Sequence, residues 1–253
     1  MKVAVVGGTG MLGTPLVAEL AARGDDVLAL SRRPGRALPD GATHRRIDLT
    51  SGEGLDEALA GIEVVVDASN SSTPRRAAPV MVEGTTRLLR AAAAAGVRHY
   101  VGVSIVGCDR VPMAYYKTKV EQEGAIAASE VPWSLLRATQ FHTLIRHMIE
   151  RDARFGIART GSARLQPIDA PLVARRLVEA ANADPAGRLP DIAGPEVQTL
   201  SGLVRTWRRA GHRALPLRLP MVGPVGRPLR EGALCNPDAA AVGPSFERWL
   251  TDG

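Results

Sequence analysis

A tyrosine and a lysine one helical turn apart are the residues most suited to chemistry. They lie in the segment Tyr115-Tyr116-Lys117-Thr118-Lys119, and residues i and i+4 share one face of a helix. A phenol has an ordinary pKa of about 10, and a neighbouring ammonium lowers that pKa by favouring the phenolate. Ser104, at the end of a predicted strand, would polarise a carbonyl oxygen from a second side. The three side chains therefore predict proton donation by Tyr115 to an oxygen whose carbon accepts a hydride.

Two alternatives accompany this catalytic set. Tyr116 is the other candidate phenol, in which case Tyr115 is a packing residue. The second alternative concerns Ser104, because a serine at a strand end can also serve simply to cap that end. Lys117 is expected in solvent.

A glycine-rich turn follows the first apolar run of the chain. Val3–Val6 leads into Gly7-Gly8-Thr9-Gly10-Met11-Leu12-Gly13 and an amphipathic segment from Pro15. Gly7 would permit a tight turn, Gly10 a close approach of backbone to a pyrophosphate, and Gly13 close packing of helix on strand. A helix N-terminus after such a turn attracts phosphates. The pattern predicts a dinucleotide site, contacted by Gly7, Thr9, Gly10, Met11, Leu12 and Gly13.

The second apolar run, Asp26–Leu30, ends in Ser31, Arg32 and Arg33 rather than in an acidic residue. An acid at this point usually accepts hydrogen bonds from the ribose 2′-hydroxyl of NAD, whereas guanidinium groups fit a 2′-phosphate. The sequence therefore favours NADP(H) over NAD(H), although ordinary surface arginines would look the same. A third predicted strand, in the segment Arg45–Leu49, ends in Asp48 and brings Asp48 and Leu49 to the adenine. The segment Val64–Asn70 is predicted as the fourth strand, and its exit loop brings Ala68 and Ser69 to the nicotinamide ribose, which Lys119 would also hydrogen-bond.

Composition narrows the class of protein. The chain has 253 residues, 45% of them hydrophobic, and a net charge of +6. There is no apolar run of about 18 residues and no leader pattern, so we expect no membrane span and a cytoplasmic location. The two cysteines, Cys108 and Cys235, are far apart and predict neither a metal site nor a disulfide. Paired arginines without a basic stripe argue against a nucleic-acid partner.

Apolar strands alternate with amphipathic helices over the first 140 residues. This alternation predicts an α/β fold, a doubly wound parallel sheet with helices on both faces. We expect one domain, with a core of about 1–140 and a substrate-binding region of about 141–253. Long helices are expected at about Pro79–Ala95, ended by Gly96, and at about Tyr115–Ser129. Arg137 is expected to be a buried structural arginine that pairs with a carboxylate or the backbone.

Taken together, these motifs resemble the short-chain dehydrogenases/reductases, and most of all the atypical, NmrA-like branch of NAD(P)H-binding proteins. The resemblance covers nearly the whole chain and rests on GGTGMLG, SIVG, YYKTKVEQE, LRATQFH, QPIDAPLVARRLVEA, DIAGPEV and FERWL. It implies a Rossmann fold, NADP(H) and a small C-terminal substrate region. It also places Gln140, Phe141 and His142 where the family's substrate loop begins. His142 is expected to be a hydrogen-bonded polar residue rather than a base.

Three functions remain open at this point. The leading one is an NADP(H)-dependent oxidoreductase acting on a small carbonyl or quinone-like compound. The second is a regulator that senses NADP(H) without chemistry, and the third is an epimerase or dehydratase with no net redox change. The only partner expected is a small-molecule substrate, with the protein a monomer or a homodimer.

Overall fold

The computed structural model describes residues 1–34, 37–71 and 73–252. These residues form two compact units, each assembled from three stretches of chain. The first unit contains Met1–Ser104, Lys117–Leu136 and Val173–Leu189. The second contains Ile105–Tyr116, Arg137–Leu172 and the chain from Pro190 onward. The sequence-based expectation of a single domain, divided at about residue 140, stays a prediction.

The first unit is built on a twisted sheet with the strand order β6-β5-β4-β1-β2-β3. The pairs β1–β2, β1–β4, β2–β3 and β4–β5 are parallel, and the short β9 adds a parallel pairing to β6. This is the doubly wound α/β fold that the sequence predicts. The strands are β1 (Lys2–Val6), β2 (Asp26–Ser31), β3 (Ala42–Arg46), β4 (Val64–Asp67), β5 (His99–Ile105), β6 (Trp133–Ala138) and β9 (Gly187–Arg188).

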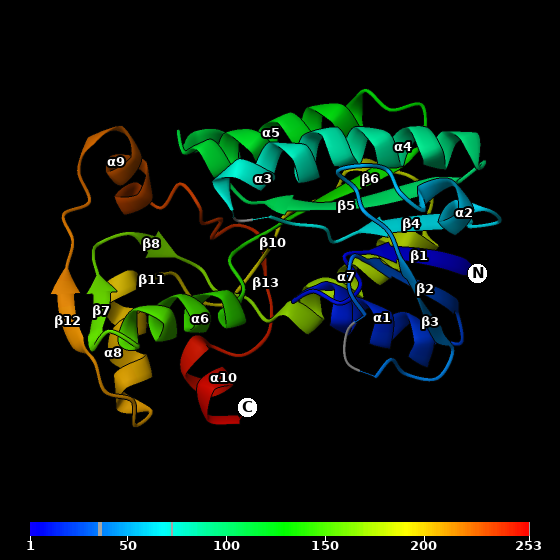
Figure 1. Cartoon of the computed structure of the whole chain (residues 1–253). Coiled ribbons are helices and arrows are strands. Elements are labelled where there is room, and N and C mark those ends of the chain that lie inside the picture. The colour runs from blue at the N-terminus through cyan, green and yellow to red at the C-terminus, as the bar shows by residue number, and fades with distance from the viewer. Residues whose placement is uncertain (35–36, 72, 253) are drawn as a thin grey trace. The chain divides into compact units, whose positions relative to one another are not determined.

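Helices cover both faces of this sheet. Figure 1 shows α4 and α5 on one face and α1 and α7 on the other. Apolar side chains of the sheet, from Ala4 and Val65 to Leu135, pack against Leu88, Leu89 and Ile126 of the helices. Burial of this continuous apolar surface is the main stabilising term of the unit. Its helices are α1 (Gly13–Ala22), α2 (Leu55–Leu59), α3 (Pro74–Ala78), α4 (Gly84–Ala94), α5 (Ala114–Ala127, shared with the second unit) and α7 (Ala170–Asn182, likewise shared).

Two expected elements differ from the structure. The third strand ends at Arg46 rather than near Asp48, because the Asp48 carboxylate accepts a hydrogen bond from the Thr50 N–H (2.8 Å) and the chain turns there. The helix expected from about Pro79 is interrupted by a π-helical turn, Pro79–Glu83, between α3 and α4. The Gly84 N–H bonds back to the Pro79 carbonyl. Proline has no N–H to continue the preceding helix, which explains why the break lies here.

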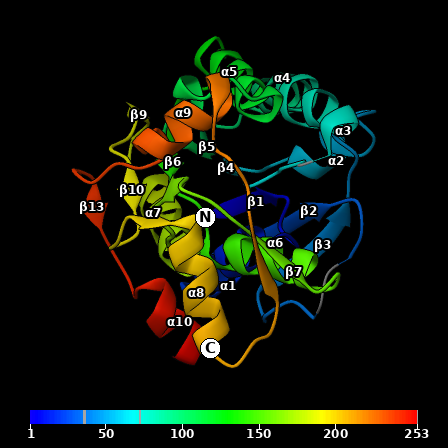
Figure 2. The ribbon, with the colours of Figure 1, turned by 90° about the vertical axis from the view of Figure 1, so that its left-hand side faces the viewer.

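The second unit is irregular and holds its own apolar cluster. In it, α6 and α8 pack around Ile145, Ile149, Leu203 and Trp207. Figure 2 shows α10 beside α8, and β12 pairs with β7 in parallel. Its elements are α6 (His142–Ala153), β7 (Ile157–Thr160), β8 (Arg164–Leu165), β10 (Ile192–Ala193), β11 (Gln198–Thr199), α8 (Leu200–Arg209), β12 (Leu215–Arg218), α9 (Gly223–Glu231), β13 (Ala240–Ala241) and α10 (Phe246–Asp252).

Among the described residues, no helix has the length and apolar character needed to cross a membrane. The two cysteines, Cys108 and Cys235, are both buried in the second unit and form no disulfide.

Candidate functional site

The glycine turn after β1 is a tightly packed backbone structure. Gly7 has a φ of +74°, and the N–H groups of both Gly7 and Gly8 donate to the Leu30 carbonyl at 2.8 and 3.2 Å. A Cβ at Gly7 would lie 2.9 Å from the Ala68 carbonyl carbon, and a Cβ on Gly13 would overlap the Gly7 carbonyl oxygen. The tight turn expected at Gly7 and the close helix packing expected at Gly13 are therefore confirmed. Gly10 is exposed at the tip.

Gly8 is a residue whose role the sequence reasoning missed. A Cβ there would lie 2.9 Å from the Ala29 side chain of β2 and from the Val5 carbonyl oxygen. Two adjacent glycines after an apolar strand were the available signal, because only the absence of a side chain lets the turn lie this close to the neighbouring strand. Thr9, Met11 and Leu12 complete the turn, and of these only Leu12 is buried.

Positive charges gather beyond the ends of β2 and β3. Arg32 and Arg33 are exposed, as a contact with an external anion requires. A hydrogen bond from Thr50 is the largest cause holding the pKa of Asp48 below its ordinary value, and the charges of Arg32 and Arg76 act in the same direction. Arg76 was not expected here, because nothing in the local sequence indicates that α3 returns to this end of the sheet. Ser31 hydrogen-bonds His44 (2.9 Å), a second residue that the sequence did not indicate.

A carboxylate at the end of β4 hydrogen-bonds the loop that follows, whereas a buried hydroxyl in that loop has no hydrogen-bond partner among the described residues. One oxygen of Asp67 accepts the Ser69 N–H at 2.8 Å, which fixes the backbone of Ala68 and Ser69. The Ser69 hydroxyl is buried, and no described residue hydrogen-bonds it. Buried hydroxyls normally have a partner. An unsatisfied hydroxyl beside a glycine turn with exposed backbone fits a polar ligand such as the ribose or phosphate of a dinucleotide.

Lys119 is buried to 4% exposure, unusually for a lysine. Its Nζ donates to the Val103 carbonyl at 2.9 Å and to the Gln122 Oε1 at 2.7 Å. Ser104, also in the first unit, is buried near the end of β5. Lys119 therefore has a fixed ammonium, whereas Lys117 is exposed as expected.

Tyr115 and Tyr116 lie in the first turn of α5 and belong to the second unit, where their rings meet edge to face at 5.5 Å. Tyr116 packs against the apolar cluster of that unit. Burial, with a smaller effect from Tyr115, raises the pKa of Tyr116 well above its ordinary value. Tyr116 is therefore a packing residue with a phenol that resists ionisation. The catalytic roles of Tyr115, Lys119 and Ser104 stay predictions.

Arg137 is a buried structural arginine, as expected. Its Nη1 donates to Asp109 at 2.7 Å within the second unit. Partial burial alone would raise the pKa of Asp109, but hydrogen bonds from its own backbone and from Arg137 outweigh burial and leave the pKa below its ordinary value. This pair fixes the turn at Cys108–Arg110 to the end of β6.

The three residues expected at the substrate loop have contacts of their own in the second unit. Gln140 donates to the Leu234 carbonyl (3.0 Å) and accepts the Gln166 N–H (3.2 Å). His142 Nε2 lies 3.1 Å from the Pro244 carbonyl, and its ring stacks on Trp249. His142 is thus the hydrogen-bonded polar residue that was expected. Phe141 is half-buried, and contact of Gln140, Phe141 and His142 with a substrate stays a prediction.

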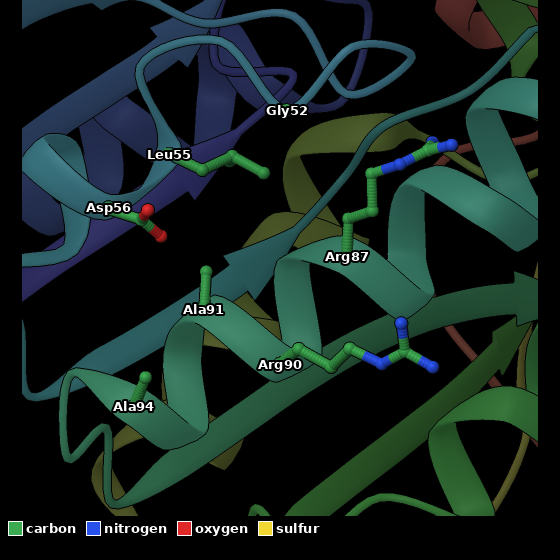
Figure 3. Close-up of a pocket in the computed structure, with 7 residues that line it drawn as sticks. All are labelled: Gly52, Leu55, Asp56, Arg87, Arg90, Ala91 and Ala94. Carbon is green, nitrogen blue, oxygen red and sulfur yellow. The ribbon is translucent and has the colours of Figure 1, made fainter.

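A groove of about 360 Å³ lies between α2 and α4 in the first unit (Figure 3). None of the predicted site residues lines it. Arg87 at its edge also donates to the Leu49 carbonyl at 3.1 Å, so α4 anchors the loop that carries Asp48 and Leu49. The groove is lined by Gly52, Leu55, Asp56, Arg87, Arg90, Ala91 and Ala94. Within residues 1–34, 37–71 and 73–252, no group of three or more His, Cys, Asp or Glu side chains could hold a metal ion.

Comparison with known proteins places this chain in a family. Residues 7–184 match the model of a family described as NAD(P)H-binding. The (4-alkanoyl-5-oxo-2,5-dihydrofuran-3-yl)methyl phosphate reductase of Streptomyces griseus is 29% identical over 226 residues, which are 87% of this chain and 76% of that protein. Quinone oxidoreductase 2 of Escherichia coli is 26% identical over 211 residues, covering 79% of this chain and 71% of that protein.

Solved structures share the fold at lower identity. An NADPH-dependent quinone oxidoreductase from Escherichia coli, complexed with NADPH, superposes with a TM-score of 0.80 at 18% identity and covers 99% of each chain. MoeE5 in complex with UDP-glucose and NAD gives a TM-score of 0.74 at 23% identity, over 89% of this chain and 87% of that one. The chain belongs to the NAD(P)H-binding family.

Proposed function

We propose that this protein is an NADP(H)-dependent reductase of a small carbonyl or quinone-like compound. The observation that carries the proposal is the buried ammonium of Lys119, held by two hydrogen bonds one helical turn after Tyr115. Burying an ammonium costs free energy, and a lysine with a purely structural role on a helix would extend into water. A cofactor sensor needs no such arrangement, so the buried lysine favours an enzyme.

Several residues of the first unit suit the cofactor. The turn from Gly7 to Gly13 would hold the pyrophosphate with backbone N–H groups. Ser69, with its unsatisfied hydroxyl, would bond the ribose next to the nicotinamide. Arg32, with Arg76 near the same carboxylate, would bind a 2′-phosphate, and this supports NADP(H) over NAD(H). When bound, the reduced nicotinamide supplies the hydride.

The remaining chemistry belongs to side chains of this protein. Tyr115 would donate its phenolic proton to the substrate oxygen, and the charge of Lys119 would stabilise the resulting phenolate. Ser104 would donate a hydrogen bond to the same oxygen. Water then returns the proton to Tyr115. Phe141 would contribute an apolar wall to the substrate region. The names of the two relatives, a (4-alkanoyl-5-oxo-2,5-dihydrofuran-3-yl)methyl phosphate reductase and a quinone oxidoreductase, support the substrate class.

A phenylalanine in place of each tyrosine tests the assignment. With NADPH and 1,4-benzoquinone or a panel of small aldehydes as probes, Tyr115→Phe should lower kcat by roughly 100-fold or more, the usual contribution of a general acid. Tyr116→Phe should retain kcat, because Tyr116 is a partly buried residue that packs against the apolar cluster. Calorimetric measurement of NADPH binding is the control that each variant keeps its cofactor site.

Full turnover by a Tyr115→Phe protein that binds NADPH would refute the catalytic role. Tight NADPH binding by the wild type without turnover of any probe would instead favour the sensing regulator.

A further inference from the structure

Five buried polar side chains of the first unit form a network that begins at Lys119 and ends at Asp67. They come from four elements: Lys119 and Gln122 from α5, Thr85 from α4, Tyr100 from β5 and Asp67 from β4. Figure 1 shows α4 and α5 together on one face of the sheet, above β4 and β5. All five residues lie within the same compact unit.

The hydrogen bonds of this network run in one direction. Lys119 donates to the Gln122 Oε1 (2.7 Å), and the Gln122 Nε2 donates to the Thr85 Oγ1 (2.9 Å). Thr85 interacts with the neighbouring Tyr100 phenol, and Tyr100 donates to the Asp67 Oδ2 at 2.7 Å. An amide has its acceptor at one end and its donors at the other. The lysine at the start therefore fixes the orientation of Gln122, and each later donor points toward Asp67.

The two ends of the network carry opposite charges, and both adjoin residues proposed to act at the nicotinamide end of the cofactor. At one end, the ammonium of Lys119 is fixed by Gln122 and by the Val103 carbonyl. At the other, Asp67 uses its second oxygen to hold the Ser69 N–H (2.8 Å). Hydrogen bonds in a low-dielectric interior polarise one another, so a chain that begins at a cation and ends at an anion behaves as a unit.

We propose that Gln122, Thr85 and Tyr100 are positioning residues that couple the Lys119 ammonium to the Ser69 loop, so that the ammonium and the loop are positioned together for the nicotinamide end of the dinucleotide. The proposal rests on the proposed function, because it assigns these ends to the cofactor. None of the three residues needs to touch the cofactor or the substrate. Their effect is exerted through Lys119 and through the backbone after β4.

The test measures NADPH affinity, which needs no substrate. Thr85→Val and Tyr100→Phe each remove one hydroxyl with little change of shape. Each should raise the Kd for NADPH about five-fold or more, the size of coupling usual within one hydrogen-bond network. The Kd of the double variant should be no higher than that of the single variant with the larger effect, because either substitution alone already interrupts the network. Thr86→Val is the matched control, since that neighbouring hydroxyl donates back to the Val82 carbonyl, one helical turn earlier, and takes no part in the network.

Urea unfolding of each variant separates affinity from folding. If Tyr100→Phe does not fold, Gln122→Glu serves in its place, because it keeps an acceptor for Lys119 but loses the donor to Thr85. Folded variants with a Kd within about two-fold of wild type would overturn the proposal, as would effects of the two single substitutions that simply multiply. A wild type that binds neither NADPH nor NADH would overturn the proposed function itself, and this inference with it.

Discussion

Burial assigns different roles to neighbouring residues that the sequence could not separate. Tyr115 and Tyr116 cannot be distinguished in the sequence. In the structure, Tyr116 packs against the apolar cluster, and burial raises its pKa. Lys117 and Lys119 differ in the same way, one exposed and the other fixed by two hydrogen bonds. The proposed acid is thus Tyr115, which lies outside that apolar cluster, and its partner is Lys119, whose ammonium is held by hydrogen bonds.

The burial of His142 should make the free energy of unfolding depend on pH. Burial lowers the pKa of His142, although the Pro244 carbonyl and the charge of Asp169 act against burial. Its Nδ1 is buried with no described hydrogen-bond partner, so a proton there would be unsatisfied. Because the folded pKa lies below the unfolded value of about 6.5, the unfolded chain takes up the proton first as pH falls. The contribution is complete above about pH 6.5 and is lost below it.

The measurement is the free energy of unfolding in urea between pH 7 and pH 5. His142→Phe keeps a ring against Trp249 and removes the titrating group, so its stability should fall less steeply over this range than that of wild type. His147→Gln, an exposed residue on the same helix, should leave the slope unchanged. A His142→Phe protein with the wild-type slope would show that His142 is not the group responsible. His99, the other buried histidine whose pKa is lowered by burial, would then be examined.

At the scale of elements, contact between the glycine turn and α1 is the feature most sensitive to substitution. Gly13→Ala would place a methyl group on the Gly7 carbonyl oxygen, which is backbone and cannot move aside. We expect a loss of roughly 3 kcal/mol or more of stability, together with loss of NADPH binding, because α1 must shift away from the turn. Urea unfolding and calorimetry measure the two effects.

Gly124→Ala is the matched control for that substitution. Gly124 lies within α5 with open space around its Cβ position. Alanine there should stabilise the protein by about 0.5–1 kcal/mol, because glycine is a poor helix residue. Two glycine-to-alanine changes are thus predicted to have opposite signs. A tolerated Gly13→Ala protein with normal NADPH affinity would show that the turn does not need this close approach.

Elements with strong local signals were predictable, and those determined by distant contacts were not. β1, β2 and β4 are apolar runs, and Gly96 ends α4 with a φ of +74° as its position indicated. β3 is an edge strand of mostly polar residues, Ala42–Arg46, so no apolar pattern marks it. The close packing of Gly84 on Leu49, where a Cβ on the glycine would lie 2.9 Å from the Leu49 side chain, is a contact that the local sequence does not contain.

For the whole molecule, the same distinction applies to the candidate site. The glycine turn, Lys119 and Arg137 could be identified because each carries its own motif or position. Thr85, Tyr100 and Asp67 could not, because they become partners only when α4, β5 and β4 come together. Arg76 was likewise missed, since its proximity to Asp48 arises from the path of the chain after β4. A net charge of +6 adds a general attraction for an anionic cofactor.

The most direct test of the account is a calorimetric titration of the protein with NADPH, NADP⁺, NADH and NAD⁺. Wild type should bind the phosphorylated pair more tightly, and Arg32→Ala should weaken only that pair, by about ten-fold, the worth of one charge-assisted hydrogen bond. Arg98→Ala is the control, because Arg98 precedes β5 at the edge where the parallel strands begin. Equal affinity for NADH and NADPH would contradict the assignment of NADP(H), and binding of none of the four would contradict the account as a whole.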